Sequence, residues 1–218
     1  VVKKWGIKKA ILYGDFLYTK TFQALNSLDN IAIANELIQC AEMLIEGEFN
    51  QIKIKSDKTI SVVQYYDVIE KKTAVLFSGI LKCLGIELCL SNEDQDQLKK
   101  LGLAYGRAFQ INDDLNDFKE SEHTGKAEFK DLSEGKFTLP VIFLLETVDV
   151  EQQKGILQLI TTQDYNAVKE LLENSNSFAL ARAERDKAIS DCIEYTERFI
   201  KLDRLDKLRV FLEKTLIA

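Results

Sequence analysis

Three carboxylates gather in one short stretch of the sequence, Asp113, Asp114 and Asp117. In a helix, Asp113 and Asp117 lie four residues apart on one face, with Asp114 beside them. Carboxylates crowded in this way repel one another, and a divalent cation relieves the repulsion. Oxygen ligands favour Mg²⁺, which takes one or two carboxylates and completes its shell with water and phosphate oxygens. A solvated acidic face is the alternative, and the carboxylates alone do not decide between the two.

Two glycine-lysine pairs follow the carboxylates, Gly125-Lys126 and Gly135-Lys136. Lysines in a glycine-containing loop can neutralise the remaining charge of a metal-bound diphosphate, because an ammonium group meets phosphate as a point charge. The alternative is that both lysines are solvated on the surface, as loop lysines usually are. The pattern makes a diphosphate site a hypothesis that the rest of the chain must support.

Helices must position these groups, because apolar residues recur at helical spacing along nearly the whole chain. We expect helices at roughly 8–27, 30–53, 59–89, 92–119, 138–147, 150–160, 164–174, 177–200 and 203–216. In the helix expected over 92–119, the face that carries Asp113 also carries Gln110, Gly106 and Gly102. Only the stretch 120–137 is long, polar and without helical spacing. Long helices with short links predict an all-α, single-domain bundle over residues 1–218.

The overall composition argues against several classes of protein. The chain has 35 acidic and 29 basic residues, a formal net charge of −6, whereas a nucleic-acid-binding domain would be basic. No apolar run is long enough to span a membrane, and no signal peptide is visible. The four cysteines lie in apolar stretches without a Cys-x-x-Cys pair, which predicts reduced core residues in a cytoplasmic protein.

The carboxylates and lysines belong to a longer pattern. Residues 109–117 have the form Phe-Gln-x-x-Asp-Asp-x-x-Asp, residues 125–126 are Gly-Lys, and residues 131–140 have the form Asp-Leu-x-x-Gly-Lys-x-Thr-Leu-Pro. A bare Asp-Asp-x-x-Asp is a weak signal. The whole string, in this order and at this spacing, resembles the second aspartate-rich region of the trans-isoprenyl diphosphate synthases, or polyprenyl synthetases.

Three other segments resemble the same family, in the family's order. Residues 10–17 are similar to the Gly-Asp helix that follows the first aspartate-rich motif. Residues 46–51 are similar to the Gly-Glu-x-x-Gln helix, in a form more typical of medium- and long-chain synthases. Residues 66–74 are similar to the helix whose Lys-Thr pair faces the allylic diphosphate. The resemblance covers essentially the whole chain and implies the isoprenoid synthase fold, a bundle of long helices around a central cavity.

The resemblance implies a reaction as well as a fold. In this family an allylic diphosphate ionises, isopentenyl diphosphate attacks the carbocation, and loss of a proton gives a product one isoprene unit longer. Family members depend on Mg²⁺, which Asp113, Asp114 and Asp117 are expected to bind. The groups expected to act catalytically are Asp113, Asp114, Lys72 and Lys136.

The family's substrate-binding residues also have counterparts in this sequence. Three lysines are expected to contact the allylic diphosphate: Lys72, Lys126 and Lys136. Gln110 and Thr73 are expected to position the substrate or support the site. Phe109 is expected to lie near the bound isopentenyl group. Family members are commonly homodimers, and the apolar helices near 10–45 and 59–90 could supply that interface.

The sequence departs from the family in two places. The first Asp-Asp-x-x-Asp motif should precede Gly14 and is absent, as are the basic residues near it. The chain begins at Val1 and its only methionine is Met43, so we expect the native protein to carry further N-terminal residues and this chain alone to show little or no activity. In the loop, Phe129 stands where the family usually has glycine, and Ala127 where proline is common.

Two other functions share this fold. A non-catalytic or regulatory subunit of a heteromeric prenyl synthase could lack the first motif, although the intact second motif and its lysines favour the enzyme. A terpene cyclase would usually carry an Asn/Asp-x-x-x-Ser-x-x-x-Glu metal motif in place of residues 113–117. We therefore expect a prenyltransferase that makes a long-chain product.

Overall fold

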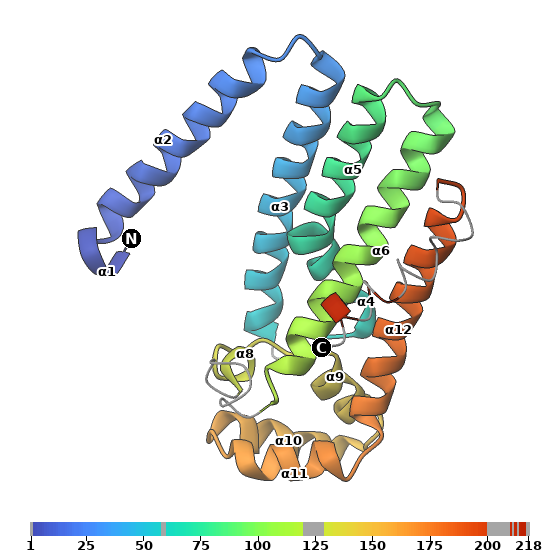
Figure 1. The fold of residues 1–218 in the computed structure, drawn as a ribbon. Helices are drawn as coiled ribbons and strands as arrows, with labels where there is room; N and C mark the ends of the chain where they lie inside the picture. The colour runs from blue at the N-terminus through green and yellow to red at the C-terminus, as the bar shows by residue number, and fades with distance from the viewer. Residues whose placement is uncertain are drawn as a thin grey trace.

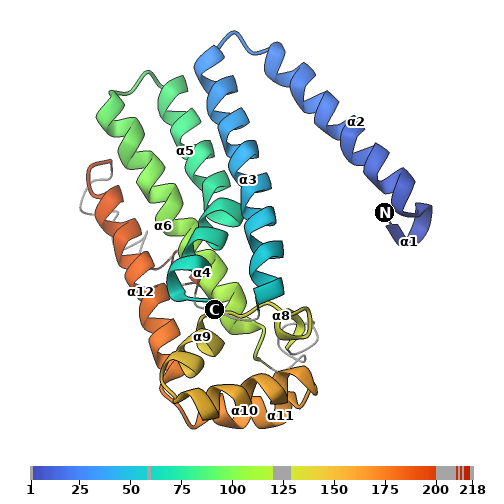
Figure 2. The ribbon, with the colours of Figure 1, turned by 180° about the vertical axis from the view of Figure 1, so that it is seen from behind.

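The computed structural model describes residues 2–57, 60–119, 129–199, 210, 212 and 214–216. All regular structure in these residues is helical, which confirms the predicted all-α fold. Four long helices form the bundle: α3 (Ile31–Asp57), α5 (Val75–Glu87), α6 (Asn92–Asn116) and α12 (Ser177–Thr196). Helix α6 packs between α5 and α12, and α3 packs against α5 on the other side (Figures 1 and 2).

Shorter helices close the lower end of the bundle in Figure 1. They are α8 (Lys130–Ser133), α9 (Leu139–Glu146), α10 (Val150–Thr161) and α11 (Tyr165–Glu173). Pro140 lies in the first turn of α9, where a missing backbone N–H costs no hydrogen bond. Apolar side chains from α9 and α11 share one core, in which Val141, Val168 and Leu172 are fully buried. This core fixes the floor of the bundle below the end of α6.

Helix α6 occupies the centre because one of its faces is made of small residues. A Cβ atom added to Gly102 would lie 2.5 Å from the Cα of Ser78, and one added to Gly106 would lie 2.3 Å from the Cα of Ala74. Such distances leave no room for any side chain, so the backbones of α5 and α6 lie in direct contact. The same face continues into the carboxylates at the end of α6, as its sequence pattern predicts.

The region predicted as one helix over 59–89 is divided in three. Helix α4 (Val62–Ile69) leads into η1, a π-helical turn (Glu70–Ala74), which leads into α5. Helices α6 and α3 contact η1 closely from two sides. Gly106 of α6 packs against Ala74, and a Cβ added to Gly47 of α3 would lie only 2.8 Å from the Cβ of Lys71. The prediction of a continuous α-helix was wrong here, because this packing is not visible in the local sequence.

Other boundaries also differ from the predictions. Helix α6 ends at Asn116 rather than near 119, and α8 lies in the described part, 129–137, of a stretch predicted to lack helical spacing. Most of the predicted final helix, 203–216, lies outside the described residues. The end of α6 falls where polar residues dilute the apolar pattern, and there a sequence pattern predicts a helix end only to within a few residues.

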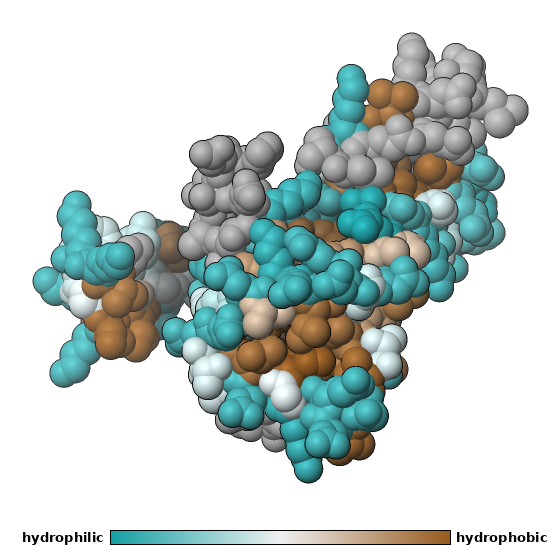
Figure 3. Space-filling view, turned by 90° about the horizontal axis from the view of Figure 1, so that it is seen from below, coloured by the Kyte–Doolittle hydropathy of each residue, from teal (hydrophilic) through white to brown (hydrophobic). Residues whose placement is uncertain are grey.

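The N-terminal helices form an arm that stands apart from the bundle. Helix α2 (Ile7–Asn26) follows the short α1 (Val2–Trp5), runs along the left of Figure 1 and joins α3 at the top. No residue of α2 is buried, and Ile11, Leu12 and Phe16 are 59%, 66% and 53% exposed. Figure 3 shows the hydrophobic side chains of the arm at the left, separate from the main body. None of the described helices is long and apolar enough to cross a membrane.

Candidate active site

A cavity of about 560 Å³ opens at the lower end of the bundle, where α6 ends. Its walls come from α3, α4, η1, α6, α10 and the segment around α8. The charged residues that line it are Lys55, Lys72, Lys130 and Lys136 with Asp113, Asp114, Asp117 and Asp131. Apolar side chains line it too, among them Ile54, Ile60, Val68, Leu157 and Ile160. One cavity thus combines a charged region with an apolar wall.

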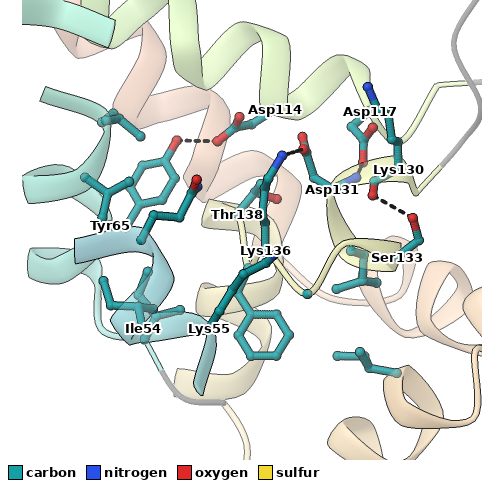
Figure 4. Close-up of a pocket in the computed structure, with 18 of the residues that line it drawn as sticks. Ile54, Lys55, Tyr65, Asp114, Asp117, Lys130, Asp131, Ser133, Lys136 and Thr138 are labelled. Atoms are coloured by element: carbon teal, nitrogen blue, oxygen red, sulfur yellow. Dashed lines mark hydrogen bonds and ion pairs between the residues drawn. The ribbon is translucent and has the colours of Figure 1, made fainter. Parts of the chain in front are cut away.

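Asp114 is held by a chain of hydrogen bonds inside the protein. The hydroxyl of Tyr65 donates to Asp114 Oδ2 at 2.6 Å, and Gln110 Nε2 donates to Asp114 Oδ1 at 2.8 Å. Gln110 Oε1 in turn accepts a hydrogen bond from the hydroxyl of Thr73 at 2.7 Å. Figure 4 shows Tyr65 and Asp114 facing one another across this contact. The chain of contacts connects α4, α6 and η1.

Burial changes the acidity of this pair. Burial raises the pKa of Asp114 to about 7, since a carboxylate removed from water is less stable when charged. The hydrogen bonds from Tyr65 and Gln110 oppose this shift, while the negative charges of Asp131 and Asp113 add to it. Burial, together with the charge of Asp114, also raises the pKa of Tyr65 well above its usual value. Tyr65 therefore stays protonated and remains a donor at neutral pH.

Asp117 connects the end of α6 to the segment that follows. Its Oδ2 accepts a hydrogen bond from the backbone N–H of Asp131 at 3.0 Å, and its backbone carbonyl accepts one from the N–H of Phe129 at 3.0 Å. Burial raises the pKa of Asp117, and the hydrogen bond from Asp131 works in the opposite direction. These contacts fix the position of α8 relative to the carboxylate helix.

Lys72 enters the cavity from the π-helical turn η1. Its ammonium group pairs with Glu48 Oε2 at 2.7 Å and donates a hydrogen bond to Gln51, both on α3. The neighbouring Lys71 pairs instead with Glu46 and Asp67 and does not line the cavity. Of two adjacent lysines, the structure therefore brings only Lys72 to the carboxylates.

Lys136 enters the cavity from the segment after α8. Its ammonium group pairs with Asp131 Oδ1 at 3.0 Å and with Glu134 Oε2 at 2.6 Å, and Figure 4 shows the contact with Asp131. In this structure Lys136 and Lys72 thus each pair with carboxylates of the protein itself. An anionic ligand that binds the two ammonium groups would displace these carboxylates from them.

Phe129 anchors the start of this segment. It has a left-handed backbone (φ 56°), which is unfavourable for a residue with a side chain. Its ring is 3% exposed and packs against Phe118 and Tyr165, with ring centroids 5.6 and 5.5 Å away. Packing of the aromatic ring offsets the backbone cost, so a phenylalanine occupies a position where the family pattern has glycine.

Comparison with known families decides what kind of protein contains this cavity. The model of the polyprenyl synthetase family matches residues 1–175. The chain belongs to the polyprenyl synthetase family. The resemblance drawn from the sequence motifs is therefore confirmed.

Individual relatives give the extent of the likeness. Octaprenyl diphosphate synthase of Escherichia coli (strain K12) is 33% identical over 195 residues, which are 85% of this chain and 60% of that protein. Geranylgeranyl pyrophosphate synthetase from Pyrococcus horikoshii has a TM-score of 0.87 at 25% identity, covering 100% of this chain and 69% of that chain.

A second solved structure agrees in fold. A polyprenyl synthase from Caulobacter crescentus, complexed with calcium and isoprenyl diphosphate, has a TM-score of 0.88 at 22% identity, covering 100% of this chain and 68% of that chain. The chain spans 60% of the length of the octaprenyl diphosphate synthases that it matches in Escherichia coli and Haemophilus influenzae.

The carboxylates of the cavity offer the donors that Mg²⁺ prefers, since all are oxygens. The charges of Asp131 and Asp113 raise the pKa of Asp114, so these groups are close enough to repel one another and to favour a cation. Among the described residues, no three His, Cys, Asp or Glu side chains form a group that could hold a metal by itself. Oxygen donors of this kind fit a Mg²⁺ ion that takes one or two carboxylates and completes its shell with diphosphate oxygens and water.

The structure brings most of the predicted site residues together. The predicted residues that line the cavity are Lys72, Thr73, Gln110, Asp113, Asp114, Asp117 and Lys136. Phe109 does not: it is 43% exposed and packs against Phe77 and Tyr105 away from the carboxylates. Lys126 lies outside the described residues.

Among the cavity residues that the sequence analysis did not assign to the site are Tyr65 and Asp131. Tyr65 precedes Lys72 by seven residues, or two helical turns, which is a signal that both share a face. Asp131 opens the motif that ends at Pro140, but its hydrogen bond to Asp117 depends on how the chain returns to α6. A signal existed for Tyr65, whereas the contact of Asp131 required the fold.

Proposed function

We propose that this protein is a trans-prenyltransferase, which condenses isopentenyl diphosphate with an allylic diphosphate to make a long-chain polyprenyl diphosphate. The observation that carries the proposal is the convergence of Asp113, Lys72 and Lys136 on one cavity that also has apolar residues in its wall. A diphosphate needs cationic groups and a metal-binding carboxylate, whereas a prenyl chain needs an apolar surface. Membership of the polyprenyl synthetase family supports the same substrates.

Each cavity residue has a role in this proposal. Of the three aspartates expected to bind Mg²⁺, Asp113 and Asp117 would hold the ion, because both oxygens of Asp114 already accept hydrogen bonds from within the protein. When bound, the ion would supply a Lewis acid for the departing diphosphate. Lys72 and Lys136 bind the allylic diphosphate after exchanging their carboxylate partners for phosphate oxygens. Thr73 orients the site through its hydrogen bond to Gln110.

Two predicted roles rest on the family pattern alone. We propose that Lys126 also contacts the allylic diphosphate and that Phe109 lies near the isopentenyl group. The aromatic side chain of Phe109 is half exposed, so a ligand can reach it from outside the charged cavity.

The reaction breaks the bond between the allylic C1 and the diphosphate oxygen, which leaves with the electron pair. The terminal alkene carbon of isopentenyl diphosphate then bonds to C1, and a proton is lost to restore a double bond. The protein's part is electrostatic, because Lys72 and Lys136 stabilise the charge that develops on the leaving group. Apolar residues such as Ile54 and Ile160 exclude water from the carbocation.

Three further properties belong to the proposal. The product is long-chain, as the Gly-Glu-x-x-Gln form of residues 46–51 and the Escherichia coli octaprenyl relative suggest. The enzyme is a Mg²⁺-dependent homodimer, in which the exposed apolar face of α2 supplies part of the interface. It is cytoplasmic, which agrees with four free cysteines.

The test uses protein expressed from the complete coding sequence. It is incubated with Mg²⁺, labelled isopentenyl diphosphate and a farnesyl or geranylgeranyl primer, and the products are sized. We expect one long product, and a loss of at least about a hundredfold in rate for Asp113→Ala. Asp96→Ala changes the same residue type at the exposed end of α6 and should leave the rate unchanged.

Absence of product from the unsubstituted protein would contradict the enzyme proposal. That result would favour a regulatory subunit of a heteromeric prenyl synthase, in which case a catalytic partner chain would restore activity. The octaprenyl and geranylgeranyl diphosphate synthases that the chain resembles favour the enzyme over that alternative.

A further inference from the structure

We propose that Tyr65 is a positioning residue, which through Asp114 sets the geometry of the metal and diphosphate site. The inference rests on the proposed function, because it assigns roles within that same cavity. It also gives Asp114 a different role from its neighbour Asp113: Asp114 orients the site, and Asp113 binds the metal.

The first argument is the surroundings of Asp114. Its side chain is 4% exposed, and Tyr65, on α4, is 3% exposed. Each carboxylate oxygen already accepts a hydrogen bond from within the protein, Oδ2 from Tyr65 at 2.6 Å and Oδ1 from Gln110 at 2.8 Å. A buried carboxylate with a donor on each oxygen is in a suitable environment to hold its neighbours in place.

The second argument is what this network joins. Gln110 also accepts the hydroxyl hydrogen of Thr73 at 2.7 Å, and Thr73 follows Lys72 in η1. The network therefore fixes the segment that carries Lys72 to the helix that carries Asp113. Both groups must face the same diphosphate, and small errors in such geometry cost large factors in rate. Tyr65 closes the network from α4, so removal of its hydroxyl loosens Asp114 and, through Gln110, Thr73.

The adjacent tyrosine provides a matched control. The hydroxyl of Tyr66 donates to Glu184 Oε2 at 2.6 Å, a contact as short as that of Tyr65. Tyr66 lines a different cavity, together with Arg107 and Lys187, and does not line the site. Phenylalanine at either position removes one hydroxyl and one short hydrogen bond to a carboxylate. The two variants therefore differ in which carboxylate loses its donor.

The test measures binding directly, using protein expressed from the complete coding sequence. Isothermal titration calorimetry with inorganic pyrophosphate is carried out with and without Mg²⁺, and the melting temperature and product formation are recorded for each variant. We expect Tyr65→Phe to weaken Mg²⁺-dependent pyrophosphate binding by about tenfold and to lower kcat, since a hydrogen bond to a charged group is lost. Tyr66→Phe should bind pyrophosphate within about twofold of the unsubstituted protein.

Equal pyrophosphate affinity in Tyr65→Phe and the unsubstituted protein, with binding lost in Asp113→Ala, would overturn the role of Tyr65 and leave the proposed function intact. Absence of both pyrophosphate binding and elongation in the unsubstituted protein would overturn the proposed function and this inference with it. The two failures are therefore distinguishable.

A second pair of variants tests the inference without changing Tyr65. In Asp114→Asn the amide oxygen still accepts from Tyr65, and a flip of the Gln110 amide restores its contacts with both Asn and Thr73. We expect Asp114→Asn to bind Mg²⁺-pyrophosphate within about threefold of the unsubstituted protein, and Asp113→Asn to bind at least about tenfold more weakly. Equal losses in the two variants would make Asp114 a metal ligand and overturn the positioning role.

Discussion

Helices α2 and α6 are of similar length, 20 and 25 residues, yet they differ in how many of their residues are buried. No residue of α2 is buried, whereas α6 buries nine, among them two glycines and Asp114. Helical spacing alone did not separate them. The difference lies in side-chain size, because Gly102 and Gly106 let α5 and η1 approach the backbone of α6 closely, while α2 presents large apolar groups that none of the described residues buries. A stripe of small residues therefore indicates a central helix better than apolar periodicity does.

The largest effect expected on α6 is the pH dependence of the free energy of unfolding, which Asp114 causes. Its pKa is raised from about 4 in an unfolded chain to about 7 in the fold. Between these values the native state binds the extra proton, so the free energy of unfolding falls as pH rises, by up to about 1.4 kcal/mol per pH unit. Asp114→Asn should flatten the slope between pH 5 and 7.

Urea denaturation at pH 5, 6, 7 and 8, in the presence of a chelator, measures this slope. The loss should level off above about pH 7, where the carboxylate is charged in both states. The same slope in the variant and the unsubstituted protein would show that the burial of Asp114 does not control it.

A smaller effect is expected from Gly106→Ala on α6. The new Cβ would lie 2.3 Å from the Cα of Ala74, so the backbone of η1 must move. Overpacking of this kind costs about 1–3 kcal/mol, which exceeds the gain in helix propensity of about 1 kcal/mol. We expect a lower free energy of unfolding, together with weaker pyrophosphate binding because Lys72 and Thr73 move with η1. Unchanged stability would mean that the contact between the helices is looser than described.

The same substitution on α2 should have the opposite sign. A Cβ on Gly14 would meet nothing within 4 Å, so Gly14→Ala keeps only the gain in helix propensity. We expect an increase of about 0.5–1 kcal/mol in the free energy of unfolding, measured by urea denaturation beside Gly106→Ala. A decrease would contradict the open surroundings of α2.

The smallest effect on stability is expected from Leu12→Gln. Leu12 is 66% exposed, so the change should alter the free energy of unfolding by no more than about 0.5 kcal/mol when the protein is dilute enough to be monomeric. Sedimentation analysis of the same variant should show weaker self-association if α2 supplies the proposed homodimer interface. Unchanged self-association would place that interface elsewhere.

The sequence predicted the fold class from short-range patterns, and most of the site residues that it predicted line the cavity. Asp113 and Asp117 lie on one face by helical spacing, and the family pattern added Lys72 and Lys136. Contacts between distant segments were not predictable in the same way. The π-helical turn η1 packs closely against Gly47 of α3, and no local pattern predicts that contact.

Single side chains show the same limit. The position of Phe109 on a helix follows from its spacing, but the structure places it away from the carboxylates, against Phe77 and Tyr105. The left-handed backbone of Phe129 is stable only because its ring packs against Phe118 and Tyr165, which come from other parts of the chain. Side-chain roles that depend on tertiary packing therefore require the structure.

The balance of four lysines and four aspartates in the described lining of the cavity has a consequence for the order of binding. A bare diphosphate would add negative charge where the ammonium groups of Lys72 and Lys136 already pair with carboxylates, and a bare divalent cation would add positive charge beside the lysines. Together the two ligands nearly cancel, so we expect each to raise the affinity for the other by the same factor, as thermodynamic linkage requires. The cavity would then bind cation and diphosphate as a single, nearly neutral ligand, and occupancy would follow the product of their concentrations.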